Sequence, residues 1–279
     1  MTALVTADVV FAESPRWHQD RLWFSDVHDY ALKTVDAAGR LRVVTAVPGR
    51  PAGLGVLPDG RMLMATGLRG AVYAVTADGD TTLVADLADR KLGLLNDMVV
   101  TPDGTAYLGD TGFKPADGEA FRPGCVWMLA PDAEPRVVAD DLAFPNGCAI
   151  TADGTTLYFA ETFGKRISRF TIGPDGSLSD RTVHVELDDN PDGLCVDAEG
   201  SLWVACVHSG VFARYGADGE LRETLRAEGA LAVTCVLGGP SRRRLFLCSA
   251  DTTLERLARG DSRARIDFVD VRVAGAGVP

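Results

Sequence analysis

The stretch Asn96-Asp97-Met98-Val99-Val100-Thr101-Pro102-Asp103-Gly104 sets the pattern of this chain. It runs from a carboxamide through a short apolar segment to an Asp-Gly turn that begins seven residues later. The same interval precedes five further turns, and its first position is occupied by Glu13, Ala52, Asn146, Asp192 and Thr234. A repeated unit therefore presents an equivalent position six times, and four of the six side chains are carboxylates or carboxamides.

Two sets of turns alternate along the chain. The first falls at positions 20, 59, 103, 153, 199 and 241, at intervals of 39 to 50 residues, and a second set lies between them. Many of these turns are Asp-Gly pairs, which favour tight hairpins because Gly accepts positive φ. Two hairpins per period give four strands, which is typical of a propeller blade. The sequence predicts an all-β fold, a six-bladed β-propeller with four antiparallel strands per blade, as a single domain over residues 1–279.

Closure of such a ring requires an extra outer strand. The segment Ala3–Phe11 has no hairpin partner of its own, and the C-terminal strands lie near Ile266–Val273. Pairing of these two segments would close the ring and protect an exposed sheet edge. We therefore expect the two ends of the chain to share one blade.

The direction of the strands places the repeated positions on one face. In each blade the innermost strand starts at the repeated position, so all six starts lie at one mouth of the central channel. The loops between second and third strands open on that face too. The third blade has 29 residues between Asp103 and Asp132, against 18 to 22 in most blades. The extra residues, within Asp110–Gly124, predict a loop that overhangs the mouth.

Composition excludes several classes of function. A net charge of −11 and a pI near 4.8 leave no basic surface for nucleic acid. No stretch approaches the roughly 20 apolar residues that span a bilayer, and the N-terminus has no signal-peptide pattern. The six cysteines form no Cys-x-x-Cys pair, which indicates buried, reduced thiols rather than a zinc cluster. We expect a cytoplasmic protein without membrane partners; the sequence carries no signal for oligomeric state.

Four oxygen-bearing side chains should meet at the mouth. Glu13, Asn96, Asn146 and Asp192 combine two carboxylates with two carboxamides, a donor set that suits one divalent cation such as Ca²⁺, Mg²⁺, Mn²⁺ or Zn²⁺. The set leaves coordination positions open for water and substrate. Turn capping is the competing interpretation for a single Asn or Asp, since Pro145-Asn146-Gly147 and Pro191-Asp192-Gly193 both resemble turns. Four occurrences at one register favour the metal.

Several segments carry a family resemblance that spans essentially the whole chain, in order. They are Glu13–Trp17, Asn96–Gly104, Pro145–Gly147, Pro191–Asp197, Leu202–Cys206 and Leu237–Pro240. Together they resemble the regucalcin (senescence marker protein)/gluconolactonase family. The resemblance implies a six-bladed propeller with a divalent metal in its channel and, in many members, hydrolysis of sugar-acid lactones.

The resemblance also implies roles for individual residues. It places Glu13, Asn146 and Asp192 as metal ligands and Asn96 as a contact to substrate or to the water of the metal. Asp97 matches the acid that follows this Asn in the family pattern. Its two interpretations are a substrate contact and a bond to backbone amides at the strand start.

One departure concerns the substrate. Sugar-lactonase members often carry an Arg two residues before the Asn of this motif, and here Leu94 occupies that place. Gluconolactone itself is therefore doubtful. Arg122, in the long third-blade loop, is a candidate for the missing donor. His208, at the upper end of a second strand, is a candidate substrate contact and proton shuttle. The other candidates at such strand ends are Asp26, Asp110 and Glu161.

The expected activity is opening of a lactone of a sugar acid or of a similar small cyclic ester. The metal would polarise the carbonyl, and Asp192 is the candidate general base. No Gly-x-Ser-x-Gly motif supports a serine hydrolase. Cleavage of phosphotriester-like substrates would use the same residues. An alternative outside the enzymes is a non-catalytic metal-binding propeller that docks a ligand or a partner. This alternative predicts that the mouth of the channel is solvated or filled by side chains.

Overall fold

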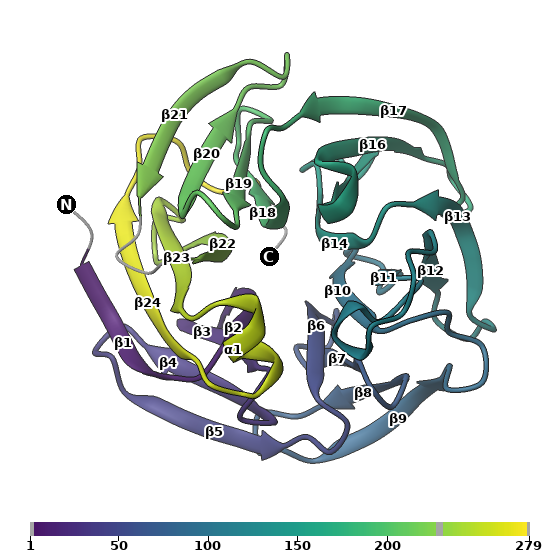
Figure 1. Cartoon of the computed structure of the whole chain (residues 1–279), viewed down its shortest axis with the longest axis horizontal. Helices are drawn as coiled ribbons and strands as arrows, with labels where there is room; N and C mark the ends of the chain where they lie inside the picture. The colour runs from purple at the N-terminus through teal and green to yellow at the C-terminus, as the bar shows by residue number, and fades with distance from the viewer. Residues whose placement is uncertain (1–2, 227–230, 278–279) are drawn as a thin grey trace.

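Six four-stranded antiparallel sheets stand around a central channel in the computed structural model, which describes residues 3–226 and 231–277 (Figure 1). The strands that face the channel are β2 (Ala12–His18), β6 (Pro51–Val56), β10 (Leu95–Val100), β14 (Pro145–Ile150), β18 (Pro191–Val196) and β22 (Leu231–Gly238). The predicted six-bladed β-propeller is confirmed.

The remaining strands follow outward in each blade. The second strands are β3 (Arg21–Asp26), β7 (Met62–Thr66), β11 (Ala106–Asp110), β15 (Thr156–Glu161), β19 (Leu202–Cys206) and β23 (Arg244–Asp251). The third strands are β4 (Ala31–Asp36), β8 (Ala71–Val75), β12 (Gly124–Leu129), β16 (Arg166–Ile172), β20 (Val211–Tyr215) and β24 (Arg263–Asp270). The outer strands are β1 (Ala3–Val9), β5 (Leu41–Ala46), β9 (Thr81–Asp86), β13 (Arg136–Leu142), β17 (Leu178–Glu186) and β21 (Leu221–Arg226).

The sixth blade contains the first and the last strands of the chain. Strand β1 pairs antiparallel with β24, with Ala3 opposite Phe268 and Val9 opposite Ala264. This pairing confirms the predicted ring closure and covers the edge that β24 would otherwise expose.

The hydrophobic core lies between neighbouring blades. One cluster joins Leu63 of β7, Met98 of β10 and Trp127 of β12, and comparable clusters fill the other junctions. All six cysteines are buried and unpaired, in agreement with the prediction. Apolar contact between blades, not disulfide bonds, therefore holds the ring together.

Each inner strand has a bulge just after its first residues. The pairing register shifts by one residue between Glu13 and Arg16, and at the corresponding place in the other five blades. Bulges re-aim side chains and are common beside functional sites. Glycine follows the repeated position in three blades, at Gly53, Gly147 and Gly193, for a packing reason. A Cβ on Gly147 would lie 2.4 Å from the carbonyl oxygen of Asp192, and one on Gly193 would lie 1.9 Å from Oγ1 of Thr234.

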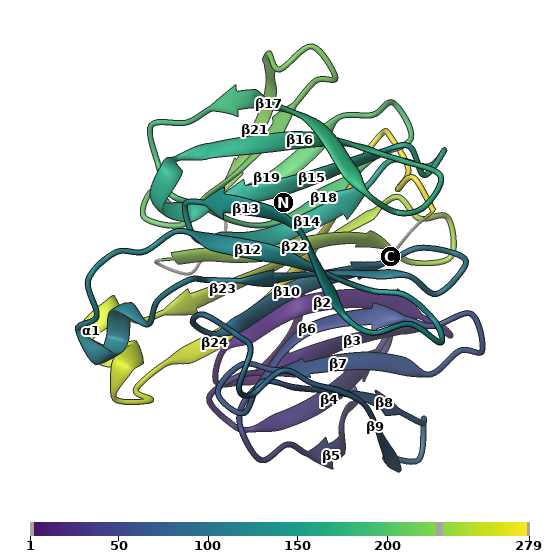
Figure 2. The ribbon, with the colours of Figure 1, turned by 90° about the vertical axis from the view of Figure 1, so that its right-hand side faces the viewer.

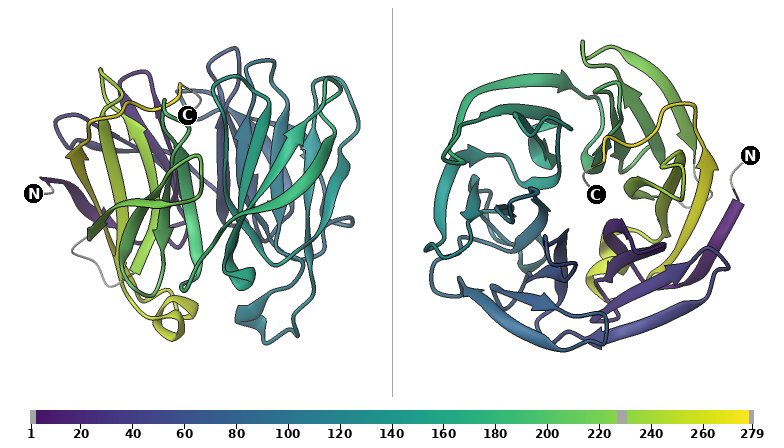
Figure 3. Two further views of the ribbon diagram at one scale, coloured as in Figure 1. Left: turned by 90° about the horizontal axis from the view of Figure 1, so that it is seen from above. Right: turned by 180° about the vertical axis from the view of Figure 1, so that it is seen from behind.

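Three short helical segments lie on one face of the ring, opposite the C-terminal segment (Figures 2 and 3). They are η1 (Pro115–Asp117), η2 (Thr162–Gly164) and α1 (Leu254–Ala258). All three belong to connections between second and third strands, and η1 confirms that the third-blade loop overhangs the mouth. Helix α1, capped by the Thr253 side chain, was not predicted. Within the described residues no helix has the length and apolarity needed to cross a membrane.

Candidate functional site

A cavity of about 580 Å³ opens at the mouth of the channel. Its floor is formed by the first residues of the inner strands and its wall by the overhanging loops. We call the floor residues the lower tier, which consists of Glu13, Ala52, Asn96, Asn146, Asp192 and Val233. The four oxygen-bearing side chains that the sequence placed at one register do lie together around one cavity.

Hydrogen bonds connect the two carboxamides of the lower tier. The Asn96 Nδ2 donates to Oδ1 of Asn146 at 2.9 Å, and the Asn146 Nδ2 donates to Oγ1 of Thr162 at 3.1 Å. Thr162 in turn donates to the carbonyl of Pro191 at 2.8 Å, directly before Asp192. Residues from three blades are thereby held in a fixed arrangement at the cavity floor.

The two carboxyl groups of the lower tier are poorly compensated. Asp192 is 8% exposed, and its Oδ1 has no hydrogen-bond partner in the structure. Burial, followed by the negative charge of Asp97, raises the pKa of Asp192 to about 8, while the Asn146 carboxamide lowers it. Burial also raises the pKa of Glu13 well above its usual range, with added repulsion from Asp192 and Asp97 and a smaller opposing effect of Arg50. Such carboxyls favour a cation between them.

The residues present fit a divalent cation. An orphaned buried carboxylate oxygen, a second carboxylate and a carboxamide supply the hard oxygen donors that such ions prefer. Among residues 3–226 and 231–277, no three His, Cys, Asp or Glu side chains gather in a metal-binding arrangement. A cation here would therefore depend on Asn146 as its third protein ligand, beside Glu13 and Asp192.

The two remaining lower-tier positions carry no donor. Ala52 lines the cavity as the sequence placed it. In the sixth blade, the residue that lines the cavity is Val233 and not Thr234, whose side chain packs against Gly193. The prediction of Thr234 was wrong by one residue. Strand β22 is longer than the other inner strands, so a count of seven residues back from the turn ends one residue after the position that lines the cavity.

Asp97 lies behind the cavity floor. It is 6% exposed and accepts hydrogen bonds from Ser14, from Nη2 of Arg16 at 3.0 Å and from the amide of Met98 at 2.8 Å. Arg16 also donates to the carbonyl of Met98. These contacts favour the backbone-bonding interpretation of Asp97 over a substrate contact.

The two predicted loop contacts lie in different places. His208 is exposed and lines the cavity, with its backbone amide bonded to Asp189 at 3.3 Å. Arg122 lies outside the cavity lining, and its guanidinium donates to the carbonyl of Leu92 and to Glu119, each at 3.3 Å. The structure therefore brings His208 to the mouth and leaves Arg122 on the outer side of its loop.

Three carboxylates at the upper ends of second strands hold the loops that enter the inner strands. Asp26 accepts from the amide of Phe11 at 2.8 Å, and Asp110 accepts from the amide of Gly93 at 2.7 Å. Glu161 accepts from the amide of Ala143 at 2.7 Å. All three carboxylates are fully buried. On sequence alone, these three carboxylates count among the candidate site residues. The structure shows instead that they position the segments that precede Glu13, Asn96 and Asn146.

A second ring of side chains lies above the lower tier and was missed by sequence reasoning. We call it the upper tier; it comprises Phe11, Arg50, Leu94, Phe144, Asn190 and Leu231, and all six line the cavity. Each lies two residues before its lower-tier neighbour, and alternate residues of an extended chain face the same side. Counting two back in every blade, and not only at Leu94, would have found Arg50.

Arg50 is the upper-tier cation. Its guanidinium makes no hydrogen bond or ion pair with the described part of the chain. Partial burial lowers the pKa of Arg50, while Tyr30, Glu13 and Asp117 raise it. Its backbone φ of 69° and that of Phe144, 67°, fall in the left-handed region that bulky residues avoid. Such strained residues cluster at binding sites, where the surrounding structure maintains them.

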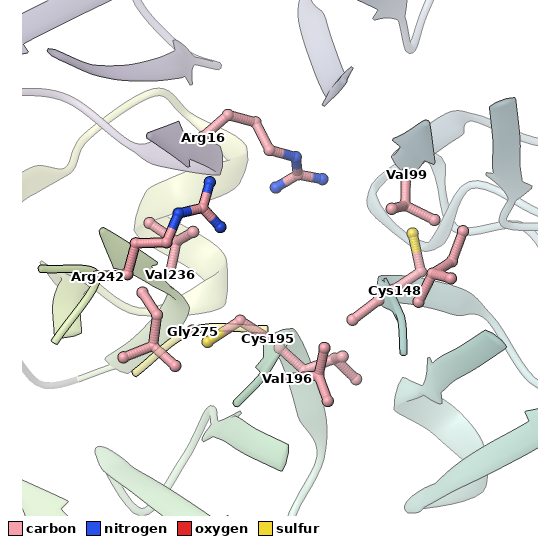
Figure 4. Close-up of a pocket in the computed structure, with 12 residues that line it drawn as sticks. Arg16, Val99, Cys148, Cys195, Val196, Val236, Arg242 and Gly275 are labelled. Carbon is pink, nitrogen blue, oxygen red and sulfur yellow. The ribbon is translucent and has the colours of Figure 1, made fainter. Parts of the chain in front are cut away.

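The other end of the channel is closed to substrates. Arg16 and Arg242 project into it beside Cys148 and Cys195, and the space left is about 20 Å³ (Figure 4). The C-terminal segment crosses the same face, where Gly275 bridges to Asp197. Among the described residues, the wide opening to the lower tier is therefore on the side of α1.

The sequence matches the family described as the SMP-30/gluconolactonase/LRE-like region over residues 11–251. The chain belongs to this family. The pentonolactonase of Haloferax volcanii is 28% identical over 256 residues, which cover 90% of this chain and 85% of that protein. Regucalcin of Homo sapiens is 26% identical over 257 residues, covering 86% and 83%.

Solved structures of the SMP-30/gluconolactonase family agree with the fold. A gluconolactonase from Xanthomonas campestris is 27% identical, with a TM-score of 0.78 over 95% of this chain and 89% of that one. A calcium-binding protein, regucalcin, from Agrobacterium tumefaciens has a TM-score of 0.86 at 24% identity, covering 100% and 96%. At that identity the second likeness supports the fold alone.

Proposed function

We propose that this protein is a divalent-metal-dependent lactonase that opens a small cyclic ester to a hydroxy acid. The observation that carries the proposal is the unpartnered, buried Oδ1 of Asp192 at the floor of an open cavity, beside Glu13 and Asn146. The pentonolactonase and gluconolactonase names of two relatives support the reaction class. The metal itself and the catalytic roles are part of the proposal.

Glu13, Asn146 and Asp192 would hold the cation. When bound, the cation acts as a Lewis acid that polarises the lactone carbonyl and stabilises negative charge on its oxygen. Asp192 accepts a proton from the attacking water as the water oxygen bonds to the carbonyl carbon. The ring C–O bond then breaks, and the alkoxide leaving group takes up a proton to give the hydroxy acid. His208, at the rim of the cavity, remains a predicted route for that proton.

Two further side chains would orient the substrate. Asn96 donates from its Nδ2 to Oδ1 of Asn146 and lines the cavity. Arg50 presents N–H donors from the neighbouring blade, where no protein group engages them among the described residues. Arg50 thus supplies the cationic donor that Leu94 does not. Holding the ester against a fixed water lowers the entropic part of the barrier.

A chelation experiment tests the proposal. The purified protein is dialysed against EDTA, and acid release from a panel of lactones is followed before and after addition of Ca²⁺, Mg²⁺, Mn²⁺ or Zn²⁺. We expect activity to vanish on chelation and to return with at least one cation. Full activity after complete metal removal would refute the metal dependence. Absence of turnover with metal bound would instead support the non-catalytic docking module.

Variants separate the roles of the ligands. Asp192→Asn keeps the side-chain shape and removes the charge, and we expect kcat to fall by at least about 100-fold, the lower end for a positioned proton acceptor. Calorimetric titration with the restoring cation shows whether binding is lost as well. Asp153→Asn, in an exposed turn, is the matched control and should change neither quantity. Unchanged kcat in Asp192→Asn would remove Asp192 from the mechanism.

A further inference from the structure

The wall of the cavity differs in chemistry from its floor. Four of the six upper-tier residues are apolar, and the loops above add further apolar side chains. The apolar residues that line the cavity include Phe11, Leu94, Phe144, Phe163, Val207 and Leu257. A molecule bound at the floor would therefore extend its outer part along a hydrocarbon surface.

Aromatic packing keeps part of this wall rigid. The ring centroids of Phe144 and Phe163 are 5.1 Å apart, and Phe113 packs edge-on against both at 5.7 and 5.3 Å. Backbone hydrogen bonds join η2 to the strand entry, from the amide of Phe163 to the carbonyl of Ala143 at 3.0 Å. Phe163 is nevertheless 50% exposed, so a large apolar face is presented without a covering group.

Three polar side chains of the wall are already hydrogen-bonded within the protein. The Thr111 hydroxyl donates to the carbonyl of Phe113, and the Thr162 hydroxyl donates to the carbonyl of Pro191. The Asn190 Nδ2 donates to the carbonyl of Thr162 at 2.8 Å. The hydroxyl groups of a sugar lactone placed against Phe144, Phe163 and Leu257 would lose water and gain no hydrogen-bond partner from these side chains. Hydrocarbon would instead gain from leaving water.

We propose that the cavity selects lactones whose ring carries an apolar alkyl or aryl substituent, with the ester at the lower tier and the substituent against Phe144, Phe163 and Leu257. This inference rests on the proposed lactonase function and specifies its substrate class. The volume of about 580 Å³ lies within the range of small-ligand sites, which leaves room for both the ring and a substituent. Arg50 contacts the polar end of such a molecule, on the Glu13 side.

Three lactones with the same six-membered ring test the inference on the metal-loaded protein. They are δ-valerolactone, which is unsubstituted, δ-nonalactone, which adds a butyl chain, and glucono-δ-lactone, which adds hydroxyl groups. We expect kcat/KM for δ-nonalactone to exceed that for δ-valerolactone by about tenfold or more, as added methylenes do in apolar pockets. Glucono-δ-lactone should be the poorest of the three.

Substitutions in the cavity wall test whether its apolar side chains cause the preference for the substituted ring. Phe163→Ser should lower the ratio of kcat/KM for δ-nonalactone to that for δ-valerolactone by about tenfold. Leu257→Ser, on a different blade, should lower the same ratio. Phe121→Ser is the matched control, because Phe121 is 55% exposed, packs on Phe113 and lies outside the cavity lining. Melting curves verify that each variant is folded.

Each outcome has a separate meaning. A best rate on glucono-δ-lactone, or equal values for the butyl and unsubstituted rings, would overturn the inference and leave the lactonase function standing. A preference that survives both wall variants would also overturn it. Absence of turnover on all three rings, with the cation bound, would refute the lactonase function and the inference with it.

Discussion

Glu161 links the stability of the ring to the position of the candidate metal ligands, and its replacement by Gln should destabilise the fold. The carboxylate is fully buried at the end of β15. It accepts from Nε of Arg166 at 3.0 Å, from Nη2 of Arg181 at 2.8 Å, from the Ser168 hydroxyl and from the Ala143 amide at 2.7 Å. Glu161→Gln removes the charge and leaves both guanidinium groups short of an anion.

The magnitude follows from the pKa of Glu161. Burial by itself raises this pKa, but the hydrogen bonds from Arg166, Ala143, Ser168 and Arg181 outweigh burial and lower it from 4.5 to about 2. The difference corresponds to about 3 kcal/mol of folding free energy. Since the two arginine side chains are 34% and 28% exposed, solvent screening reduces the expected loss to about 2–3 kcal/mol. For a chain of 279 residues this lowers Tm by about 3–5 °C.

The stabilisation by Glu161 should weaken as the pH falls. The pKa of Glu161 is lower in the folded than in the unfolded protein, so its stabilisation is complete above about pH 4.5 and is lost as the pH falls toward 2. The difference in unfolding free energy between wild type and Glu161→Gln should therefore be largest near pH 7 and about half as large near pH 3.

Urea unfolding of both proteins at pH 7 and pH 3 measures the effect. Asp218→Asn is the control, because Asp218 and Arg222 are both exposed and their ion pair should contribute little to stability. A loss below 1 kcal/mol in Glu161→Gln at pH 7, or a loss that does not shrink on acidification, would refute the reasoning.

Three further predictions concern the cation, the packing of the floor and the closure of the ring. A restoring cation at 100 times its Kd should raise the unfolding free energy of the wild type by about 2.7 kcal/mol and leave Asp192→Asn unchanged; equal denaturation midpoints with and without chelator would contradict it. Gly193→Ala should cost about 2 kcal/mol or more, because its Cβ would overlap Thr234; a melting temperature within a degree of wild type would show that the strands adjust freely. Deletion of residues 1–9 should expose the edge of β24 and produce concentration-dependent association in light scattering, and a stable monomeric product would contradict it.

The fold was predictable because its signals are local and repeated. Tight Asp-Gly turns and short β-prone runs specify each hairpin, and the interval of seven residues orients every inner strand in the same direction. The register also predicted which residues meet at the mouth, since equivalent strand starts must converge on the axis. Only in the sixth blade did the count fail, where the longer β22 moves the cavity position from Thr234 to Val233.

Other features of the site depend on backbone geometry, which the spacing of residues along the sequence does not specify. The bulge after the repeated position turns Asp97 behind the floor, toward Ser14 and Arg16. Counting two residues back would have placed Arg50 at the cavity, but nothing in the sequence signals its left-handed backbone conformation. Helix α1 is five residues long, too short to show an amphipathic period, and it contributes to the wall only because its connection folds over the mouth.

The pairing of β1 with β24 has a consequence for the order in which the molecule can assemble. Ala3 meets Phe268, a contact between residues separated by almost the whole chain, and such long-range contacts form slowly because a large loop must close first. During synthesis, the first five sheets can form before β24 leaves the ribosome, whereas the sixth cannot. The candidate ligands come from blades one, four and five, so their mutual distances settle only when this last sheet closes the circle. Cation affinity should therefore appear late in refolding, after most of the β-structure has formed.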